Sequence, residues 1–435
     1  MNNVDFFRQM LRSQSEGKPV GIYSVCSANA YVLLAAMEQS AEDDMFVLIE
    51  ATANQANQFG GYTGMKPDDF SRLVYSLADE CGFPKERIIL GGDHLGPIVW
   101  KDMPESEAMP LAEEMVTAFV NAGFSKIHLD TSMRLADDCT DEHLSNEKVA
   151  SRGAKLCTAA EKAWKNLPWA KPVVYVIGSE VPTPGGPQEE IETLRPTNPE
   201  AFLSSYHAFN SAFEDAGLTE AFSRVVGFVV QPGVEFTGDQ VFEYDREAAS
   251  DLCAALAKLT SPLVFEGHST DYQNPVSLRH MVEDGIAILK VGPALTFALR
   301  EGLMALECIE KELAAAAGLM PSGFISVLEA AMLGDSGNWK NHYRGDGNKL
   351  RMQLRYSFFD RARYYLVVPE VSAAIEKLLH NLEKTGIPLN MLSQYMPQSF
   401  ERVRLGVLSP EPRALLKDYV KRCLRGYSKA VATGR

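Results

Sequence analysis

The stretch 87–97 reads R-I-I-L-G-G-D-H-L-G-P. An apolar run at 88–90 ends in two glycines, and Asp93 and His94 follow at once. A buried strand that ends in a carboxylate and an imidazole is typical of the mouth of an α/β barrel, where the carboxyl ends of the strands carry the active site. The arrangement recurs along the chain, because strand after strand ends in a polar residue.

Continuous apolar, β-branched runs predict eight strands that are buried on both faces. They span residues 19–25, 46–50, 87–92, 126–130, 173–178, 225–231, 262–266 and 286–291. Helix candidates alternate with them at 28–39, 67–81, 107–122, 146–165, 199–216, 245–259, 275–283 and 293–317. This alternation predicts a (β/α)8 TIM barrel over residues 1–317. An open doubly wound sheet is less favoured, since no G-x-G-x-x-G follows the first strand.

Residues 318–435 are predicted to form a helical extension that packs on the barrel or at a subunit interface. This region contains aromatic and basic clusters such as R-Y-S-F-F-D-R-A-R-Y-Y at 355–365. Amphipathic helices of this kind bury their aromatic side chains and leave their charges in solvent. We therefore expect the aromatic residues in a core or an interface, and the charges on a solvated helix face.

The composition excludes several functional classes. The formal net charge of −15 argues against a nucleic-acid or anionic-membrane surface. The seven cysteines include no C-x-x-C pair, so neither a disulfide framework nor a structural zinc module is expected. No apolar run approaches the ~20 residues of a membrane span, and the first residues lack the pattern of a signal peptide. We expect a cytoplasmic protein.

Polar residues at the strand ends predict a site with three kinds of residue. Histidines and carboxylates at one rim are suited to a divalent cation, and we expect zinc with His94, Glu235 and His268 as ligands. Asp93 or Glu180 is expected to move a proton, and Lys290 to hold charge at the site. The remaining candidates for substrate or phosphate binding are Asn54, Gln55, Asp130, Gln231, Ser269, Thr270 and Gly292.

Each of these assignments has a plainer alternative. The whole set could form a satisfied polar layer around a solvent-filled mouth. His128 alternates with apolar neighbours, which favours a core histidine over a ligand, and Cys26 is expected to pack. Lys290 is expected to pair with a carboxylate or an anion rather than form a Schiff base. Gly292, which opens a helix, fits the usual barrel phosphate site or is a simple turn residue.

Long motifs make the chain resemble the GatZ/KbaZ-like family. The motifs are S-V-C-S-A (24–28), I-E-A-T-A-N-Q-A-N-Q-F-G-G-Y-T-G-M (49–65), I-L-G-G-D-H-L-G-P (89–97), A-G-F-S-K-I-H-L-D (122–130), V-V-Q-P-G-V-E-F (229–236), H-S-T-D-Y-Q (268–273), A-I-L-K-V-G-P-A-L-T-F-A-L-R-E (287–301), R-Y-Y (363–365), S-Q-Y (393–395) and F-E-R (400–402). The resemblance implies a TIM barrel and a non-catalytic subunit of class II D-tagatose-1,6-bisphosphate aldolase. It also implies a catalytic aldolase subunit as partner, and a role in galactitol, tagatose or N-acetylgalactosamine catabolism.

The barrel also resembles the class II aldolases themselves, more distantly. Asp93 and His94 match their Asp-His pair of acid/base and zinc ligand, and His268 matches their ligand after strand seven. Two features depart from that pattern. Gln231 and Glu235 stand where the histidine after strand six would be, and Gly292 replaces the asparagine of the strand-eight motif. These departures put three-histidine zinc chemistry in doubt.

Two functions follow from the resemblance and from the polar residues at the strand ends that match those of the class II aldolases. The first is an accessory subunit that stabilises and activates a class II tagatose-1,6-bisphosphate aldolase. The second is a metal-dependent ketose or ketose-phosphate 4-epimerase, since a subunit without chemistry has little use for Asp93, His94 and His268 together. A tagatose 6-phosphate kinase is disfavoured because the chain has no G-x-x-x-x-G-K-[ST] loop, and no nucleotide is expected. The ligand is expected to be a sugar phosphate, and a homo-oligomer is left open.

Overall fold

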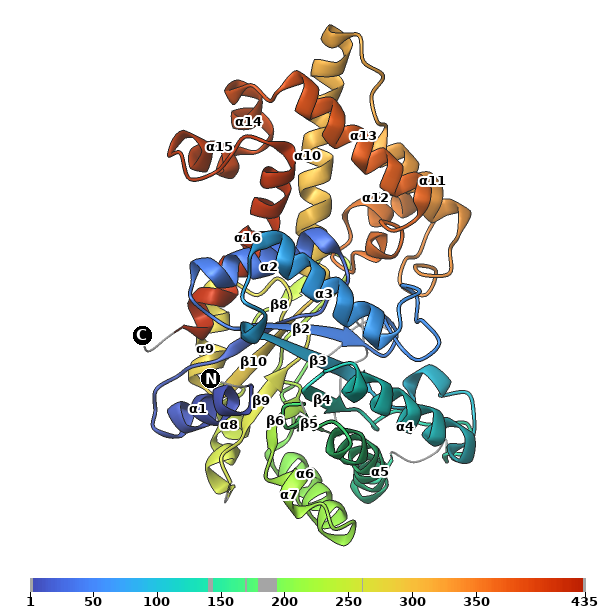
Figure 1. Ribbon diagram of the computed structural model, residues 1–435, viewed down its shortest axis with the longest axis vertical. Coiled ribbons are helices and arrows are strands. Elements are labelled where there is room, and N and C mark those ends of the chain that lie inside the picture. The colour runs from blue at the N-terminus through green and yellow to red at the C-terminus, as the bar shows by residue number, and fades with distance from the viewer. Residues whose placement is uncertain (1–2, 140–143, 169, 179–193, 260, 433–435) are drawn as a thin grey trace.

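A closed barrel of eight parallel strands lies at the centre of the computed structural model, which describes residues 3–139, 144–168, 170–178, 194–259 and 261–432 (Figure 1). The strand order is β1-β10-β9-β6-β5-β4-β3-β2, and β1 pairs with both β2 and β10. The strands are β1 Ile22–Val25, β2 Val47–Thr52, β3 Ile88–Leu95, β4 Lys126–Leu129, β5 Val174–Ile177, β6 Val225–Val230, β9 Val264–Gly267 and β10 Ile286–Val291. The predicted TIM barrel is confirmed.

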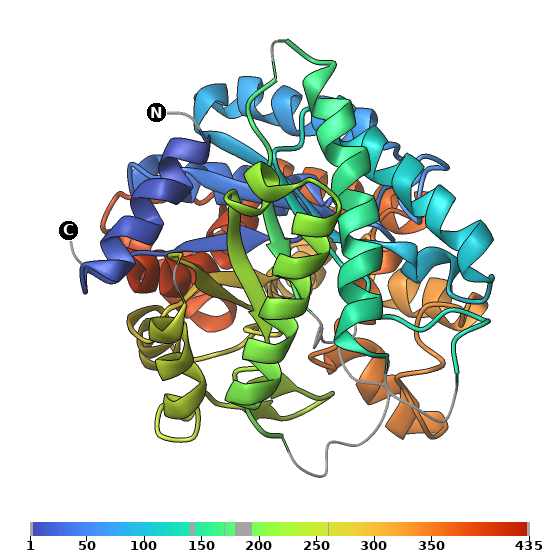
Figure 2. The ribbon, with the colours of Figure 1, turned by 90° about the horizontal axis from the view of Figure 1, so that it is seen from below.

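Helices connect successive strands and cover the outside of the barrel. They are α2 Ala30–Glu42, α3 Pro67–Cys81, α4 Glu105–Asn121, α5 Asn146–Lys165, α6 Pro199–Asp215, α8 Ser250–Ala255, α9 Pro275–Glu283 and α10 Pro293–Ala317, with a short α7 Thr219–Phe222. Figure 2 shows α5 and α6 packed side by side on the outer face. The prolines at the starts of α3, α6, α9 and α10 occupy the first helical turn, where no amide hydrogen is needed.

The helix predicted at 245–259 is much shorter in the structure. The Asp245 side chain accepts hydrogen bonds from the amides of Glu247 and Ala248, which forms a turn, and α8 begins only at Ser250. A single 3-10 turn, Leu256–Lys258, follows it. Two short strands, β7 Glu235–Phe236 and β8 Val241–Phe242, pair as a hairpin at the end of β6. Two further 3-10 turns, Lys85–Arg87 and Pro97–Trp100, flank β3.

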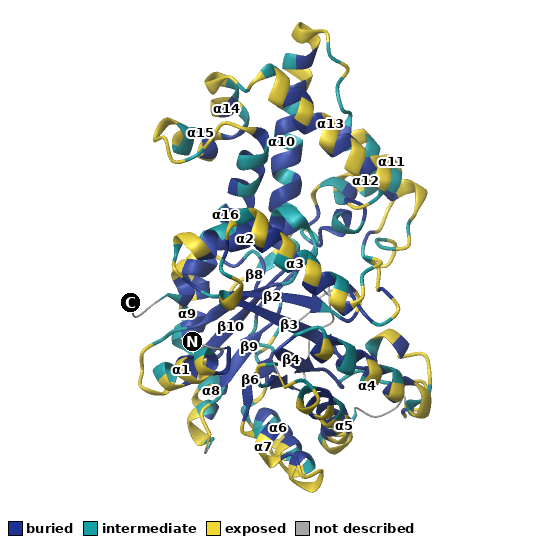
Figure 3. Ribbon diagram, viewed as in Figure 1, coloured by how far each residue is buried: buried dark blue, intermediate teal, exposed yellow. Residues whose placement is uncertain are grey.

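Alternating side chains divide each strand between two cores. Outward residues such as Ile49, Leu90 and Ile127 pack under the helices in one large cluster. Inward residues at the amino ends, such as Leu48, Ile89 and Ile288, form a second cluster inside the barrel. The amino-terminal helix α1 Asn3–Ser15 closes that end with the apolar side chains of Val4, Phe7, Met10 and Leu11. Figure 3 shows the strands buried and the exposed residues confined to the outer helix faces and the loops.

The carboxyl-terminal region rises from the barrel on α10, one continuous helix (Figure 1). It contains α11 Phe324–Gly334, α12 Gly347–Tyr356, the 3-10 turn η4 Arg361–Tyr364, α13 Pro369–Thr385, α14 Leu389–Tyr395, α15 Pro397–Arg404 and α16 Pro412–Val431. Helices α11, α13 and α14 pack on α10, whereas α16 returns to the barrel and packs on α2, α9 and α10. Among the described helices, none is both long and apolar enough to cross a membrane.

Candidate functional site

A layer of paired charges lies inside the barrel, above the apolar inner core. The Lys126 ammonium lies 2.6 Å from a Glu50 carboxylate oxygen and 2.7 Å from Glu266. Lys290 forms an ion pair with Glu50 and lies 2.6 Å from Asp93. These five residues come from β2, β3, β4, β9 and β10, and their side chains are almost completely buried. The predicted pairing of Lys290 with a carboxylate is what the geometry shows.

Gly91, the first residue of the motif G-G-D-H (91–94), leaves space for the Glu50 side chain of this layer. A Cβ atom at this position would lie 2.4 Å from Glu50 Oε1 and 2.6 Å from Glu50 Cγ. The Glu50 carboxylate cannot move aside freely, because Lys126 and Lys290 hold it and the Ser24 hydroxyl donates a 2.6 Å hydrogen bond to it. The first glycine of G-G-D-H is therefore required by a side chain on the neighbouring strand.

A backbone irregularity turns both Asp93 and His94 toward the site. Adjacent side chains of a regular strand point to opposite faces. Here His94 has a φ of 50°, and the pairing of β3 with β4 shifts register between Gly92 and Leu95. A non-glycine residue in the left-handed region is uncommon, and such strain clusters at functional sites. The amide nitrogen of His94 lies 3.2 Å from His128 Nδ1, next to the bond between that imidazole and Asp93.

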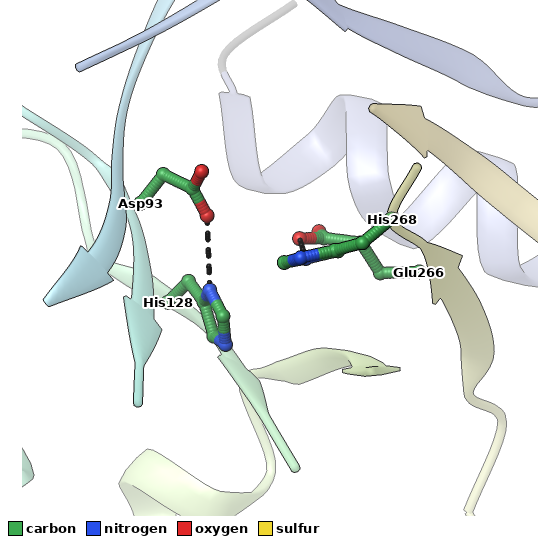
Figure 4. Close-up of side chains that lie close together, drawn as sticks. All are labelled: Asp93, His128, Glu266 and His268. Atoms are coloured by element: carbon green, nitrogen blue, oxygen red, sulfur yellow. Dashed lines mark hydrogen bonds and ion pairs between the residues drawn. The ribbon is translucent and has the colours of Figure 1, made fainter. Parts of the chain in front are cut away.

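Three imidazoles meet at the mouth, and each bonds a carboxylate of its own. His94 Nδ1 lies 2.8 Å from Asp130, His128 Nδ1 lies 3.0 Å from Asp93, and His268 Nε2 lies 3.0 Å from Glu266. The ring centroids of the three histidines are 4.8–5.3 Å apart. Figure 4 shows Asp93 with His128 on one side and Glu266 with His268 on the other. Carboxylates bonded to one ring nitrogen in this way orient imidazoles that bind metals.

The charges of this buried cluster do not balance without a cation. Four carboxylates, those of Glu50, Asp93, Asp130 and Glu266, face two ammonium groups. Burial alone would raise the pKa of Asp93, but His94, Lys290 and the hydrogen bond from His128 hold it well below its usual value. Burial lowers the pKa of His94, but Asp93 and Asp130 outweigh it, so that pKa is raised. Even with a protonated His94 beside the two lysines, the four carboxylates leave the site with an excess of negative charge.

The donor set fits a divalent cation. Asp93, His128, Glu266 and His268 each offer a ligand atom, and these atoms lie within 4.8 Å of one another. His128 Nε2 is buried and has no hydrogen-bond partner in the described part of the chain. Burial, with the positive charges of His94 and Lys290, lowers the pKa of His268 to about 4, so this imidazole is neutral near pH 7 and can act as a ligand. Imidazole and carboxylate donors together suit zinc and similar ions.

The sequence-predicted metal ligands are spread over two places. His268 belongs to the four-residue group, and the His94 ring contacts it edge-on. Glu235 lies elsewhere, on β7, where it accepts hydrogen bonds from the Phe236 amide and the Ser269 hydroxyl. Burial raises the pKa of Glu235 to about 7.

A pocket opens above the cluster and receives some of the predicted substrate residues. Asn54, Gln55, Ser269 and Gly292 line it together with Asp93, His94, His268 and Lys290. Three other candidates already use their polar groups in hydrogen bonds within the protein. Asp130 bonds His94, the Gln231 side chain accepts from the amides of Gly233 and Val234, and the Thr270 hydroxyl donates to the Lys290 carbonyl. Glu180 lies outside the described residues.

Several pocket and cluster residues were not predicted from the sequence, among them His128, Arg363 and Tyr364. His128 was predicted to be a core histidine, since its apolar neighbours on β4 hide that its own side points into the barrel. Arg363 and Tyr364 line the pocket from the carboxyl-terminal region, about 70 positions beyond the last strand. The only signal for them was the basic and aromatic run R-A-R-Y-Y (361–365).

Comparison with known proteins identifies the family of this chain. The model of the family described as D-tagatose-1,6-bisphosphate aldolase subunit GatZ/KbaZ-like matches residues 7–432. A crystal structure of a probable tagatose 6-phosphate kinase from Sinorhizobium meliloti 1021 is 46% identical, with a TM-score of 0.86, and covers 94% of this chain and 100% of its own. A fructose-bisphosphate aldolase from Campylobacter jejuni is 16% identical, with a TM-score of 0.47, over 88% of this chain and 93% of its own. The chain belongs to the GatZ/KbaZ-like family of D-tagatose-1,6-bisphosphate aldolase subunits.

Proposed function

We propose that the barrel mouth is a metal-assisted sugar site that breaks and re-forms a carbon–carbon bond. The substrate would be a ketose phosphate, and the reaction its epimerisation at C4, as between fructose 6-phosphate and tagatose 6-phosphate. The observation that carries this proposal is the set of three imidazoles, each bonded to its own carboxylate, above a buried lysine–carboxylate network. A purely structural subunit has no need of such a costly arrangement of buried charge.

The chain's own groups account for the proton and the charge. Asp93 is ionised and takes the proton of the C4 hydroxyl while the C3–C4 bond breaks, which leaves an aldehyde and an enediolate fragment. Lys290 keeps its proton, because Asp93 and Glu50 raise its pKa well above normal despite burial, so it supplies positive charge rather than a nucleophile. Rotation of the aldehyde and re-addition give the C4 epimer, and Asp93 returns the proton to the new hydroxyl.

His128, Glu266 and His268 would hold a divalent cation, with zinc the ion we expect, and Asp93 lies beside them to move the proton. Such an ion would supply Lewis acidity toward the substrate oxygens and would offset the excess negative charge of the carboxylates. Metal analysis of the purified protein is expected to find about one ion per chain, and His128→Ala with His268→Ala is expected to abolish it.

Activity is tested on the purified, metal-loaded protein with fructose 6-phosphate. We expect tagatose 6-phosphate to form, chelation to stop the reaction, and zinc to restore it. His268→Ala and Asp93→Asn should each lower the rate about 100-fold or more. The matched control is His207→Ala, on the exposed face of α6, which should leave the rate unchanged. A fully metal-loaded protein that interconverts no ketose phosphate would rule out the epimerase.

The family description favours a second candidate, an accessory subunit that stabilises and activates a catalytic class II aldolase. Large apolar side chains exposed on the carboxyl-terminal region agree with a protein partner, among them Met320, Leu405 and Val407. The test adds the protein to a cognate aldolase subunit and measures cleavage of tagatose 1,6-bisphosphate. A stable complex with raised aldolase activity, together with no epimerisation by the chain alone, would favour this function. Adding ATP and tagatose 6-phosphate to the same assays tests whether the protein has tagatose 6-phosphate kinase activity.

Both candidates place the chain in the breakdown of galactitol, tagatose or amino sugars. We propose a cytoplasmic location, because sugar phosphates are handled there and the seven cysteines are unpaired.

A further inference from the structure

The 3-10 turn η4 closes one side of the barrel mouth, although it lies far beyond the barrel in sequence. Its residues Arg363 and Tyr364 line the same pocket as Asp93, His94 and His268. The Tyr364 ring packs edge-on against Tyr62, from the loop after β2, with 4.7 Å between ring centroids. The carboxyl-terminal region thus contributes directly to the candidate site.

Buried contacts fix this turn on the barrel. The Asp360 carboxylate, immediately before η4, accepts hydrogen bonds from Arg300 Nε at 2.8 Å and the Thr296 hydroxyl at 2.6 Å. The Tyr272 hydroxyl donates to the Phe358 carbonyl at 2.7 Å, and the two rings lie 4.5 Å apart. Asp360 and Tyr272 both have positive φ values, of 44° and 65°. The guanidiniums of η4 are therefore held in place rather than carried on a loose tail.

Two positive charges in this turn lack a carboxylate partner. Arg363 donates to the carbonyls of Phe359 and Asp360 and to the Tyr364 hydroxyl, and Arg361 Nε donates to the Asn338 carbonyl. Neither guanidinium forms an ion pair with a carboxylate of the described chain. The Arg361 side chain is nevertheless largely removed from solvent, at 8% exposed. Both cations lie over the Tyr364 ring, at 4.5 and 4.6 Å from its centroid. Arg361 is buried and Arg363 is half-buried, so both charges are partly removed from water, and an anionic ligand would offset that cost.

The usual phosphate site of a barrel is closed in this protein. The amides of Gly292 and Ala294, at the start of α10, both donate to the Asp271 carboxylate, at 2.9 and 2.8 Å. The chain thus supplies its own anion where barrel enzymes commonly bind a phosphate. A phosphate at this mouth needs another set of donors.

We propose that Arg363, with Tyr364, binds the phosphate group of a sugar phosphate at the barrel mouth, and that Arg361, against the Tyr364 ring, adds positive charge nearby. A phosphate monoester carries close to two negative charges, which the charges of Arg363 and the nearby Arg361 would offset, and it accepts several hydrogen bonds at once. The identity of the sugar rests on the proposed function, but the phosphate site does not. Phosphorylated and unphosphorylated sugars would be distinguished by the carboxyl-terminal region, while the barrel strands hold the reacting carbons.

Calorimetric titration tests the phosphate site directly. The wild-type protein is titrated with fructose 6-phosphate, fructose, inorganic phosphate and a hexuronate, which carries a carboxylate in place of the phosphate. We expect fructose 6-phosphate to bind at least tenfold more tightly than fructose or the hexuronate. Arg363→Gln should remove that preference and leave the affinity for fructose unchanged, and Tyr364→Phe should weaken it in part. Arg404→Gln, an exposed arginine on α15, is the matched control and should keep it.

These outcomes are independent of turnover, so a chain that binds phosphate without epimerising still supports the site. A folded Arg363→Gln protein that keeps the full preference for fructose 6-phosphate would overturn the assignment. So would a wild-type protein that binds neither fructose 6-phosphate nor inorganic phosphate, or one that prefers the hexuronate. If Arg363→Gln does not fold, Arg363→Lys keeps the charge without the planar fork, and its preference should still fall several-fold.

Discussion

At the scale of the residue, single atoms decide whether the site can form. His94 departs from regular strand backbone so that it and Asp93 both serve the mouth. Gly91, two positions before Asp93, has no side chain where Glu50 must lie. Gly91 in the motif G-G-D-H is thus required by a contact with β2, and the backbone at His94 is fixed by the pairing with β4.

Gly91→Ala is expected to destabilise the protein by about 1–3 kcal/mol, because the new methyl group would overlap a Glu50 side chain that two lysines hold. It should also weaken metal binding, since Glu50 and Asp93 share Lys290. Urea unfolding and metal titration measure both effects. Gly334→Ala is the control, because its Cβ meets nothing within 4 Å, and it should be neutral or slightly stabilising. Equal effects of the two substitutions would contradict the explanation.

Asp271 is expected to make stability depend on pH. Burial raises its pKa to about 6, from 3.8, against the two amides that favour its ionised form. The folded state therefore holds a proton that the unfolded state has already released between about pH 4 and pH 6. Stability from this group is present below pH 4 and is lost as the pH rises through 6, by about 3 kcal/mol in total.

Asp271→Asn removes this titration and keeps an oxygen that can accept from Gly292 and Ala294. The free energy of unfolding of the variant, relative to wild type, should therefore rise by about 3 kcal/mol between pH 4 and pH 7. Urea unfolding of both proteins at the two pH values measures the difference. A constant difference between the two proteins would show that Asp271 does not titrate in this range.

At the scale of the element, α10 and η4 explain how a distant segment reaches the site. Helix α10 begins at the barrel mouth and leads the chain away, yet Arg300 and Thr296 on its first turns also anchor Asp360 on the way back. The Arg300 guanidinium lies 4.4 Å from the Phe297 ring centroid, which further fixes its direction. The buried ion pair of Asp360 with Arg300 is therefore one of the contacts that hold η4 at the barrel mouth.

Asp360→Ala is expected to cost about 3–5 kcal/mol, since it leaves the Arg300 charge buried without its partner. The affinity for fructose 6-phosphate should fall as well, because η4 loses its anchor. Thermal unfolding and calorimetric titration provide the two readouts. Arg279→Ala breaks an exposed pair with Glu283 on α9 and should cost less than about 1 kcal/mol. A similar small cost for Asp360→Ala would show that η4 is held by its aromatic contacts instead.

At the scale of the whole molecule, two helices connect the barrel with the carboxyl-terminal region: α10, which leaves the barrel, and α16, which returns to it. Helix α16 packs on α2, α9 and α10 and buries Leu416, Val420, Leu424 and Tyr427. The Tyr427 hydroxyl donates to the Thr270 carbonyl at 2.6 Å, beside the site. The end of the chain is thereby part of the helix layer around the barrel, which couples the two regions energetically.

We expect one cooperative unfolding transition for the whole chain. Leu416→Ala in α16 should lower the stability of the barrel and of the carboxyl-terminal region together, by about 2–5 kcal/mol. Differential scanning calorimetry and hydrogen exchange of the β2 and β10 amides measure this. Leu405→Ala, at a residue that is 75% exposed, should change neither. Two separate transitions, with only one shifted by Leu416→Ala, would contradict the coupling.

The sequence by itself determined the barrel. Its eight strands and alternating helices follow from local apolar runs and turn residues, and these signals need no long-range information. It also placed Asp93, His94, His268 and Lys290 at one rim, because parallel strands bring their carboxyl ends together. The departures from the aldolase pattern at Gln231 and Gly292 were visible in the same way.

Only the tertiary structure decided which of these groups act together. The position of His128 among the other imidazoles depends on the register of β4 beside β3, and a one-residue change of register would turn it outward. Asp271 occupies the predicted phosphate site through a contact across 21 positions. Arg363 and Tyr364 reach the pocket through a buried ion pair across 60 positions. Contacts at such separations depend on packing, which local sequence patterns do not encode.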